Sequence, residues 1–293
     1  MNAGTTYRYR HCDVIVESMI PIDNWRADDS ARPAEVAITC ARGIEPATPP
    51  FEQFETDGDA VRFAVERVGE WRIQNGERIA IRADSGITDE VLALFTAGSA
   101  WAALGGQRGW VQWHGSAVML PGARTVLLAG ESGAGKSTMA AALIARGGRL
   151  VADDFSRVEF GEAPVIYPSS GRIRLGIDHD RSASDCGHYA GKTYCAVSSV
   201  ETDRVGLDGI VILAWGEETR CDRIGGAEAV AALLEATAYR PELDALAGRY
   251  TVLARAAMQA AGCLPVVRFT RTRNVEPGMA AAFLSDALGL ADV

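Results

Sequence analysis

The stretch Gly130-Glu131-Ser132-Gly133-Ala134-Gly135-Lys136-Ser137 fits the pattern G-x-x-x-x-G-K-[ST] at every fixed position. An apolar run at 125–129 leads into it, and a helix-forming run at 138–146 follows it. The glycines let backbone N–H groups converge on a phosphate, and the start of the helix adds partial positive charge. The stretch therefore predicts a strand, a phosphate-binding loop and a helix that bind a nucleoside triphosphate.

Residue types within this loop indicate separate tasks. We expect Lys136 to reach the β- and γ-phosphates and the Ser137 hydroxyl to bind Mg²⁺. The other loop positions are expected to surround the phosphates with their backbone: Gly130, Glu131, Ser132, Gly133, Ala134, Gly135 and Thr138. A nucleoside triphosphate and Mg²⁺ are thus the ligands that the loop predicts.

Composition excludes several classes of protein. At 293 residues the chain has room for one large domain or two modest ones, and its net charge of −9 disfavours a nucleic-acid binder. No apolar run is long enough to span a membrane, and residues 1–10 lack the apolar core of a signal peptide. The six cysteines contain no C-x-x-C pair and favour reduced thiols over disulfides or zinc. We expect a cytoplasmic protein with no nucleic-acid or membrane partner, and a homo-oligomer is left open.

The first part of the chain predicts a small antiparallel β module over 1–105. Asn75-Gly76 lies between two alternating runs, which is a strong hairpin signal. A helix is expected from Asp89 to about Leu104, ending at Gly105-Gly106. Short alternating runs predict the strands of the module: 13–17, 35–39, 61–65, 70–73 and 78–82.

Residues 106–293 predict an α/β domain built around the loop. The segments 110–120 and 125–129 predict a hairpin, which would place His114-Gly115-Ser116 opposite Gly130. The polar, glycine-containing segment 167–199 is expected to be an irregular functional loop or lid. Further strands are expected at 149–153, 207–215 and 264–270, and helices at 227–239, 242–261 and 278–288.

Two adjacent carboxylates, Asp153 and Asp154, follow the loop by one predicted helix and one predicted strand. A helix over 137–146 runs roughly 15 Å, and a strand over 149–153 returns roughly 16 Å. A right-handed crossover then brings both carboxylates beside Lys136 and Ser137. One can hold Mg²⁺ and the other can accept a proton from an attacking hydroxyl, which favours a kinase. An Asp pair that merely starts a turn is the alternative.

Three segments together resemble the catalytic domain of the HPr kinase/phosphorylase family and its related serine kinases, some of which tailor lasso peptides. They are His-Gly-Ser-Ala-Val at 114–118, Gly-Glu-Ser-Gly-Ala-Gly-Lys-Ser-Thr at 130–138 and Arg-Gly-Gly-Arg-Leu-Val-Ala-Asp-Asp at 146–154. The resemblance implies a fold shared with phosphoenolpyruvate carboxykinase, and transfer of phosphate from ATP with Mg²⁺ to a serine hydroxyl.

The same resemblance implies the roles of individual residues. Lys136 and Ser137 would contact phosphates and metal, and Asp153 or Asp154 would serve as metal ligand and catalytic base. His114 matches the family histidine beside that acid. We assign the metal to Ser137 and Asp154, and catalysis to Asp153, Asp154, His114 and Lys136.

Cationic side chains in the segment 167–199 are further candidates. Arg172, Arg174 or Lys192 could neutralise charge on the transferred phosphoryl group, and ordinary solvated loop charges are the equal alternative. The chain does not contain the family's Gly-Leu-Gly-Ile-Ile-Asn-Val-like signature, and the stretch most similar to it is 172–178. The amino-terminal half also differs from that of the HPr enzymes. We therefore expect an acceptor other than HPr.

The sequence thus predicts an α/β protein with a P-loop catalytic domain like that of HPr kinase and PEP carboxykinase, preceded by a small β-rich domain. The predicted function is an ATP-dependent kinase that phosphorylates a hydroxyl, with a serine of a peptide or protein, such as a natural-product precursor peptide, as the expected acceptor. A small-molecule hydroxyl kinase and a nucleotide-gated regulatory ATPase are the alternatives.

Overall fold

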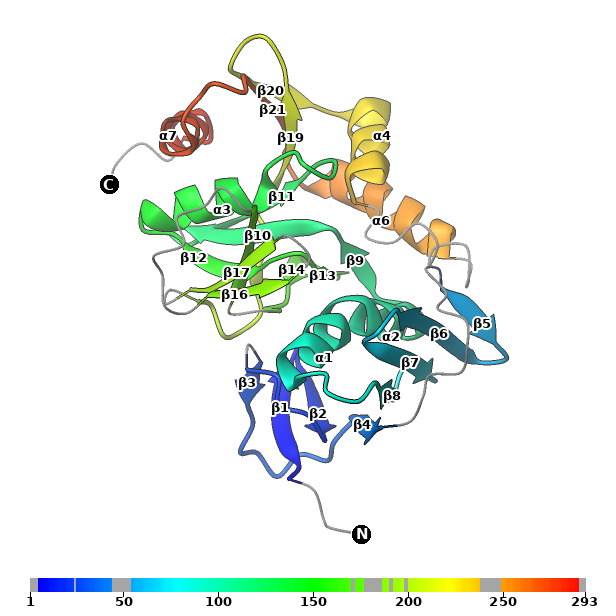
Figure 1. Ribbon diagram of the computed structural model, residues 1–293. Coiled ribbons are helices and arrows are strands. Elements are labelled where there is room, and N and C mark those ends of the chain that lie inside the picture. The colour runs from blue at the N-terminus through cyan, green and yellow to red at the C-terminus, as the bar shows by residue number, and fades with distance from the viewer. Residues whose placement is uncertain are drawn as a thin grey trace. The chain divides into compact units, whose positions relative to one another are not determined.

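The computed structural model describes residues 5–23, 25–43, 54–169, 172–176, 186–189, 192–197, 200–237 and 249–289. Contacts divide the chain into two compact units, Met1–Trp110 with Arg240–Tyr250, and Val111–Tyr239 with Thr251–Val293 (Figure 1). The boundary between 105 and 106 stays a prediction. Among the helices described, none is long and apolar enough to cross a bilayer.

The first unit is built on an eight-stranded sheet, drawn from blue to cyan in Figure 1. Its strand order is β3-β1-β2-β4-β8-β7-β6-β5. The strands are β1 Tyr7–His11, β2 Val14–Ser18, β3 Arg26–Ala27, β4 Val36–Arg42, β5 Glu55–Asp57, β6 Ala60–Val65, β7 Gly69–Gln74 and β8 Arg78–Ala83. Alternating apolar residues produce these strands because successive side chains point to opposite faces of a sheet.

This sheet is mixed, and the prediction of a wholly antiparallel module is wrong. β4 runs parallel to both β2 and β8, with Val16 opposite Val36 and Ile38 opposite Ile79. Parallel neighbours are joined through long connections, which local turn signals do not reveal. The hairpin between β7 and β8 is confirmed, and Asn75 and Gly76 in its turn have φ of 55° and 65°.

A nearly continuous helix follows the sheet. It comprises α1 Asp89–Phe95, a π-helical turn Thr96–Ala100 and α2 Trp101–Gln107. Trp71 Nε1 of β7 donates to Thr96 Oγ1 at 3.0 Å, and this hydroxyl in turn donates to the Leu92 carbonyl at 2.7 Å. The helix continues past Gly105 and Gly106, and it is Gly109, at φ 70°, that takes the left-handed conformation after it.

The second unit contains a six-stranded sheet with the order β12-β10-β11-β19-β21-β20. The strands are β10 Gly115–Leu120, β11 Arg124–Ala129, β12 Arg149–Ala152, β19 Gly209–Trp215, β20 Arg220–Ile224 and β21 Val266–Arg271. β11, β19 and β21 are parallel neighbours, while β10 pairs antiparallel with both β11 and β12. The predicted crossover therefore exists, but β10 lies between its two strands, and the edge strand β20 was not expected.

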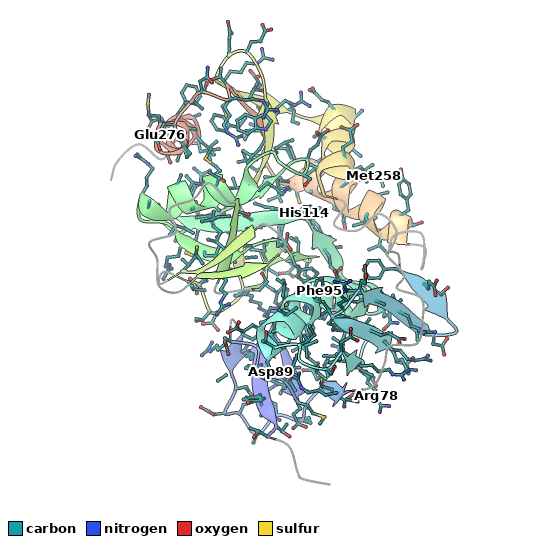
Figure 2. The ribbon with its side chains drawn as sticks, in the orientation of Figure 1. Arg78, Asp89, Phe95, His114, Met258 and Glu276 are labelled. Atoms are coloured by element: carbon teal, nitrogen blue, oxygen red, sulfur yellow. The ribbon has the colours of Figure 1, made fainter. Side chains whose placement is uncertain are left out.

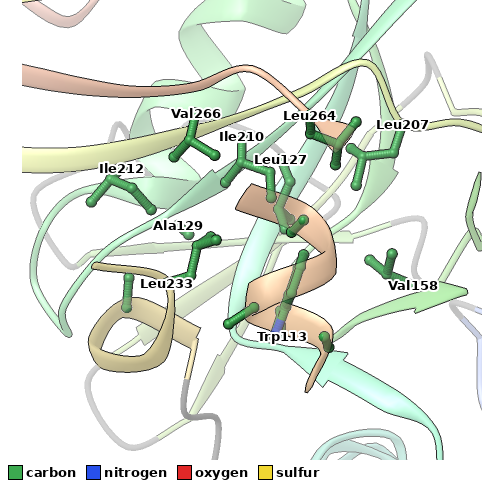
Figure 3. Close-up of a cluster of buried hydrophobic side chains, with 14 of the residues drawn as sticks. Trp113, Leu127, Ala129, Val158, Leu207, Ile210, Ile212, Leu233, Leu264 and Val266 are labelled. Carbon is green, nitrogen blue, oxygen red and sulfur yellow. The ribbon is translucent and has the colours of Figure 1, made fainter. Parts of the chain in front are cut away.

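Both faces of this sheet are buried by apolar side chains. On one face Leu127, Ala129, Ile210 and Ile212 pack with α4 Gly226–Thr237 and α6 Arg249–Cys263, a cluster that also contains Trp113 (Figure 3). On the other face, alternate residues of the same strands pack with α3 Lys136–Ala145 and α7 Pro277–Ala287. Strands buried on both faces are typical of parallel sheets, whose ligands gather at the carboxyl ends of the strands.

Two small sheets complete the second unit. The first has the order β18-β14-β13-β9, with β9 Val111–Trp113, β13 Ser156–Phe160, β14 Pro164–Ile166 and β18 Val205–Gly206. The second, β15-β17-β16, comprises β15 Arg172–Gly176, β16 Cys186–Tyr189 and β17 Lys192–Ala196. The prediction of an irregular segment over 167–199 is therefore wrong for these strands.

The cysteines are not all reduced, although the composition favours reduced thiols. Cys195 is disulfide-bonded, and Cys186 lies opposite it in the register of β16 and β17. The prediction holds for the free cysteines of the described part, which are Cys12, Cys40, Cys221 and Cys263. The spacing of the cysteines along the chain does not identify this disulfide, because the pairing of β16 with β17 decides which residue lies opposite Cys195.

Candidate functional site

The glycine loop has the backbone that its sequence predicts. It connects β11 to α3, and Gly130, Gly133 and Gly135 have φ of 148°, 82° and 78°. A Cβ at Gly130 would lie 2.7 Å from the Leu213 carbonyl oxygen, so glycine is required there by space as well as by conformation. The loop therefore follows the neighbouring parallel strand β19 closely before it enters the helix.

The carbonyl groups of this loop are occupied by side-chain donors. Lys136 is buried, and its Nζ donates to the carbonyls of Gly130 and Glu131 at 2.8 and 3.1 Å. Trp215 Nε1 donates to the Gly133 carbonyl at 3.1 Å, and Arg271 Nη2 donates to the Ala134 carbonyl. Side chains from three parts of the chain thus fix the conformation of the loop.

The N–H groups of the loop are the complementary half of this arrangement. Within the described part of the chain, the backbone N–H groups of Ser132, Gly133 and Gly135 have no acceptor. Together with the amino end of α3, these donors fit an anion such as a phosphate. The residues present therefore match the triphosphate that the sequence predicts.

Asp153 lies directly after β12 and is almost completely buried, at 5% exposure. Its Oδ1 accepts hydrogen bonds from Ser137 Oγ at 3.0 Å and from Ser116 Oγ at 2.5 Å. Ser137 lies in the first turn of α3, and Ser116 lies on β10 between the two strands of the crossover. This confirms the predicted return of Asp153 to Ser137, whereas the carboxylate of Asp154 contacts His114 instead.

Asp154 takes a different direction from its neighbour. Its φ is 65°, and Phe155 N donates to the Asp153 carbonyl at 2.7 Å, which closes a tight turn around Asp154. A non-glycine residue at positive φ is strained, and such strain is concentrated at functional sites. Asp154 Oδ1 lies 3.4 Å from His114 Nε2, and both side chains are about one quarter exposed, at 26% and 25%. One turn therefore separates two adjacent carboxylates into two environments.

The hairpin of β10 and β11 positions His114 beside Asp154. Gly115 pairs with Ala129 and Ser116 with Leu128, so His114 lies opposite the start of the glycine loop, between β9 and β10 (Figure 2). A Cβ at Gly115 would lie 2.7 Å from the Leu128 carbonyl oxygen, which explains the glycine between His114 and Ser116. The predicted position of this segment opposite Gly130 is confirmed by the register.

The other cationic candidates lie on two strands of the three-stranded sheet. Arg172, Arg174 and Lys192 lie on β15 and β17, with Arg174 opposite Tyr194 and Lys192 opposite Gly176. The side chains of Arg174 and Lys192 lie outside the described part. Ile173 and Leu175 of β15 are buried in the cluster on the α3 side of the sheet. A role for these three cations in phosphate binding stays a prediction.

Sequence reasoning missed three residues of the site. Ser116 belongs to the segment 114–118 that carried the family resemblance, so its hydroxyl beside Asp153 could have been suggested. Trp215 and Arg271 end β19 and β21, and no local motif marked them. They are found only because parallel strands bring their carboxyl ends to the same edge of the sheet.

The donor set near Asp153 fits a magnesium ion. Ser137 and Asp153 present a hydroxyl and a carboxylate oxygen, which are the hard ligands that Mg²⁺ prefers. In the described part of the chain, no three His, Cys, Asp or Glu side chains are arranged to hold a metal ion. Such a sparse set is typical of sites in which phosphate oxygens and water complete the coordination of Mg²⁺.

Comparison with known proteins agrees with this geometry. Residues 110–172 match the family model of the HPr Serine kinase C-terminal domain. The chain is 33% identical over 114 residues to an HPr kinase/phosphorylase of Prosthecochloris aestuarii, covering 39% of this chain and 32% of that protein. It is 35% identical over 116 residues to an HPr kinase/phosphorylase of Chlorobaculum tepidum, covering 39% and 32%. The matched region thus spans about a third of the length of these relatives.

A likeness to a solved structure was also found. The structure of the Hpr(Ser) kinase/phosphatase from Coxiella burnetii aligns with a TM-score of 0.34 and 14% identity, covering 61% of this chain and 96% of that one. The family resemblance noted in the sequence is confirmed by the family model, which matches the segment that contains the glycine loop, the acidic pair and His114.

Proposed function

We propose, on the premise that residues 110–172 form an HPr serine kinase C-terminal domain, that this chain is an ATP-dependent kinase that transfers a phosphoryl group to a hydroxyl. The acceptor is proposed to be a serine of a peptide or protein. The observation that carries the proposal is the separation of Asp153 and Asp154, of which one faces Ser137 and the other His114. A simple nucleotide hydrolase needs only the first of these arrangements.

In this proposal Ser137 and Asp153 hold Mg²⁺, which neutralises charge on the β- and γ-phosphates when it is bound. This revises the assignment of the metal to Asp154, because Asp153 accepts the hydrogen bond of Ser137. Ser116 fixes the orientation of the Asp153 carboxylate through its own hydrogen bond. When the nucleotide binds, Lys136 Nζ donates to phosphate oxygens in place of the loop carbonyls that it contacts now.

Asp154 is the proposed general base. It accepts the proton of the acceptor hydroxyl as that oxygen attacks the γ-phosphorus, and the bond from phosphorus to the leaving ADP oxygen breaks. His114 Nε2 lies within ion-pair distance of Asp154 Oδ1 and orients the carboxylate. Because both side chains are partly exposed, an acceptor hydroxyl can approach Asp154, whereas Asp153 is buried and leaves no such room.

The proposal is tested by mass spectrometry of acceptors. The full chain is incubated with ATP, Mg²⁺ and a panel of serine-containing peptides, proteins and small-molecule alcohols, and each acceptor is examined for the mass of one added phosphate. A product in the wild type that is absent with Lys136→Ala supports the proposal. Steady release of free phosphate that no acceptor changes would support a regulatory ATPase instead, and a phosphorylated small alcohol would identify a small-molecule kinase.

The acceptor is the expected partner, and the acidic net charge of −9 argues against nucleic acid. We infer a cytoplasmic location from the chemistry, since ATP and Mg²⁺ are abundant there.

A further inference from the structure

Arg271 is a buried cation placed against the glycine loop. It ends β21, and its side chain is buried, with the residue only 4% exposed. Its Nη2 donates to the Ala134 carbonyl, and a Cβ at Gly135 would lie 2.6 Å from the same nitrogen. The guanidinium therefore lies directly beneath the turn that leads into α3.

Trp215 holds this guanidinium from the side. The Arg271 Cζ lies 4.0 Å from the centroid of the Trp215 ring, and Trp215 Nε1 donates to the Gly133 carbonyl. A planar guanidinium stacks on an aromatic face in a way that a lysine does not. The pair from the ends of β19 and β21 is thus fixed to two successive residues of the loop.

The charge of Arg271 lacks a counterion among the residues that the structure describes. No carboxylate of that part of the chain pairs with it, and its buried Nη1 has no hydrogen-bond partner there. Desolvation lowers its pKa to about 10, so the residue still carries its charge at neutral pH. A buried charge is costly unless an opposite charge and hydrogen bonds compensate it. One anion bound at the loop would compensate this cation and accept from the loop N–H groups as well.

We propose that Arg271 is a phosphate-binding residue of the nucleotide site, held in position by Trp215. The ligand class is a polyphosphate, namely the di- or triphosphate of the bound nucleotide. The inference rests on the nucleotide-binding part of the proposed function and is independent of the acceptor. It assigns to Arg271 the charge neutralisation for which the sequence suggests Arg172, Arg174 or Lys192.

The test measures binding of ATP, inorganic tripolyphosphate and adenosine to the full chain by isothermal titration calorimetry with Mg²⁺. Arg271→Met is expected to weaken the binding of ATP and of tripolyphosphate about 10-fold to 100-fold, which is the range for loss of a hydrogen bond to a charged group. The affinity for adenosine should stay unchanged. The matched control is Arg273→Met. Arg273 is exposed and lies over the same Trp215 ring at 5.1 Å, so its loss should change the affinity by less than about twofold.

Two further variants keep the test decisive if Arg271→Met does not fold. Arg271→Lys keeps the charge but loses the stacked fork, and Trp215→Phe keeps an aromatic face but loses the bond to Gly133. Each variant is expected to weaken the binding of tripolyphosphate several-fold. In the wild type, Trp215 is 37% exposed, so polyphosphate should change its fluorescence, and Trp215→Phe should abolish that change.

Several outcomes overturn the inference. Unchanged polyphosphate affinity in the folded Arg271 variants would show that the residue has only a structural role, even if the melting temperature falls. An equal loss of polyphosphate affinity in Arg273→Met would show that general surface charge, and not the position of Arg271, causes the effect. A wild type that binds no polyphosphate would also overturn it, whereas normal binding without any phosphorylated acceptor would contradict only the kinase proposal.

Discussion

Ser116 Oγ donates a 2.5 Å hydrogen bond to Asp153 Oδ1 within the buried part of the site. The serine comes from β10, which lies between the loop strand β11 and the acid strand β12. The strand that separates the two halves of the crossover therefore supplies the group that joins them chemically. Each residue of His-Gly-Ser has its own contact here: His114 contacts Asp154, Gly115 permits the close approach of the Leu128 carbonyl, and Ser116 contacts Asp153.

The first prediction concerns Ser116→Ala. Loss of its hydroxyl leaves the Asp153 carboxylate with one donor fewer, and a hydrogen bond to a charged group contributes about 1.5–3 kcal/mol. We expect kcat to fall about tenfold or more and the Mg²⁺ concentration for half-maximal rate to rise. The control is Ser18→Ala, another buried serine, whose hydroxyl donates to the Ile20 carbonyl at 2.7 Å in the first unit. Equal kinetics in the two variants would contradict a role for Ser116.

The second prediction separates the two carboxylates by kinetics. Asp153→Asn should raise the Mg²⁺ requirement, because it changes the group beside Ser137. Asp154→Asn should lower kcat about 10²–10⁴-fold and leave ATP affinity nearly unchanged, as expected for loss of a general base. Rates and ATP affinities measured across a Mg²⁺ titration distinguish the two patterns. Full transfer activity in Asp154→Asn would rule out the base assignment.

The third prediction compares two glycines of the same loop. At Gly133 no atom lies within 4 Å of the place that a Cβ would take, so Gly133→Ala bears only the cost of a φ of 82°, about 1–2 kcal/mol. At Gly130 the Cβ would also meet the Leu213 carbonyl at 2.7 Å. Gly130→Ala should therefore lower the free energy of unfolding by clearly more than Gly133→Ala does. Urea denaturation of both variants provides the measurement, and equal losses would contradict the close approach of loop and strand.

The fourth prediction concerns the pH dependence of stability in the first unit. Burial lowers the pKa of His11 from 6.5 to about 3, and its ring stacks on Trp25 at 4.1 Å. Below pH 6.5 the unfolded chain binds a proton at this position that the folded protein excludes until about pH 3. The contribution of His11 to stability is therefore present above pH 6.5 and is lost as pH falls through this window, by on the order of 4–5 kcal/mol.

The measurement is the free energy of unfolding of the wild type and of His11→Phe between pH 7 and pH 4. Phenylalanine keeps an aromatic ring against Trp25 and Trp101 but does not titrate. The difference between the two proteins should grow in favour of the variant as pH falls, since the carboxylates common to both cancel. A constant difference across this range would show that His11 is not held neutral.

The local parts of the site were predictable because they depend on neighbouring residues. The glycines and Lys136 define the phosphate loop wherever a strand precedes it and a helix follows it. The geometry of the predicted hairpin placed His114 opposite the loop, and the lengths of the predicted helix and strand placed Asp153 near Ser137, as observed. These steps need only chain lengths, periodicity and turn chemistry, all of which are written in the sequence.

The sequence by itself determined that this chain contains a strand, a phosphate-binding loop, a helix and an acidic pair in one continuous segment. Only the tertiary structure decided which carboxylate faces Ser137 and which faces His114, because a single positive φ at Asp154 sets their directions. It also brought Trp215 and Arg271 to the loop from the ends of distant strands. Contacts between residues far apart in the chain depend on sheet order, and no local pattern encodes the order in which strands assemble.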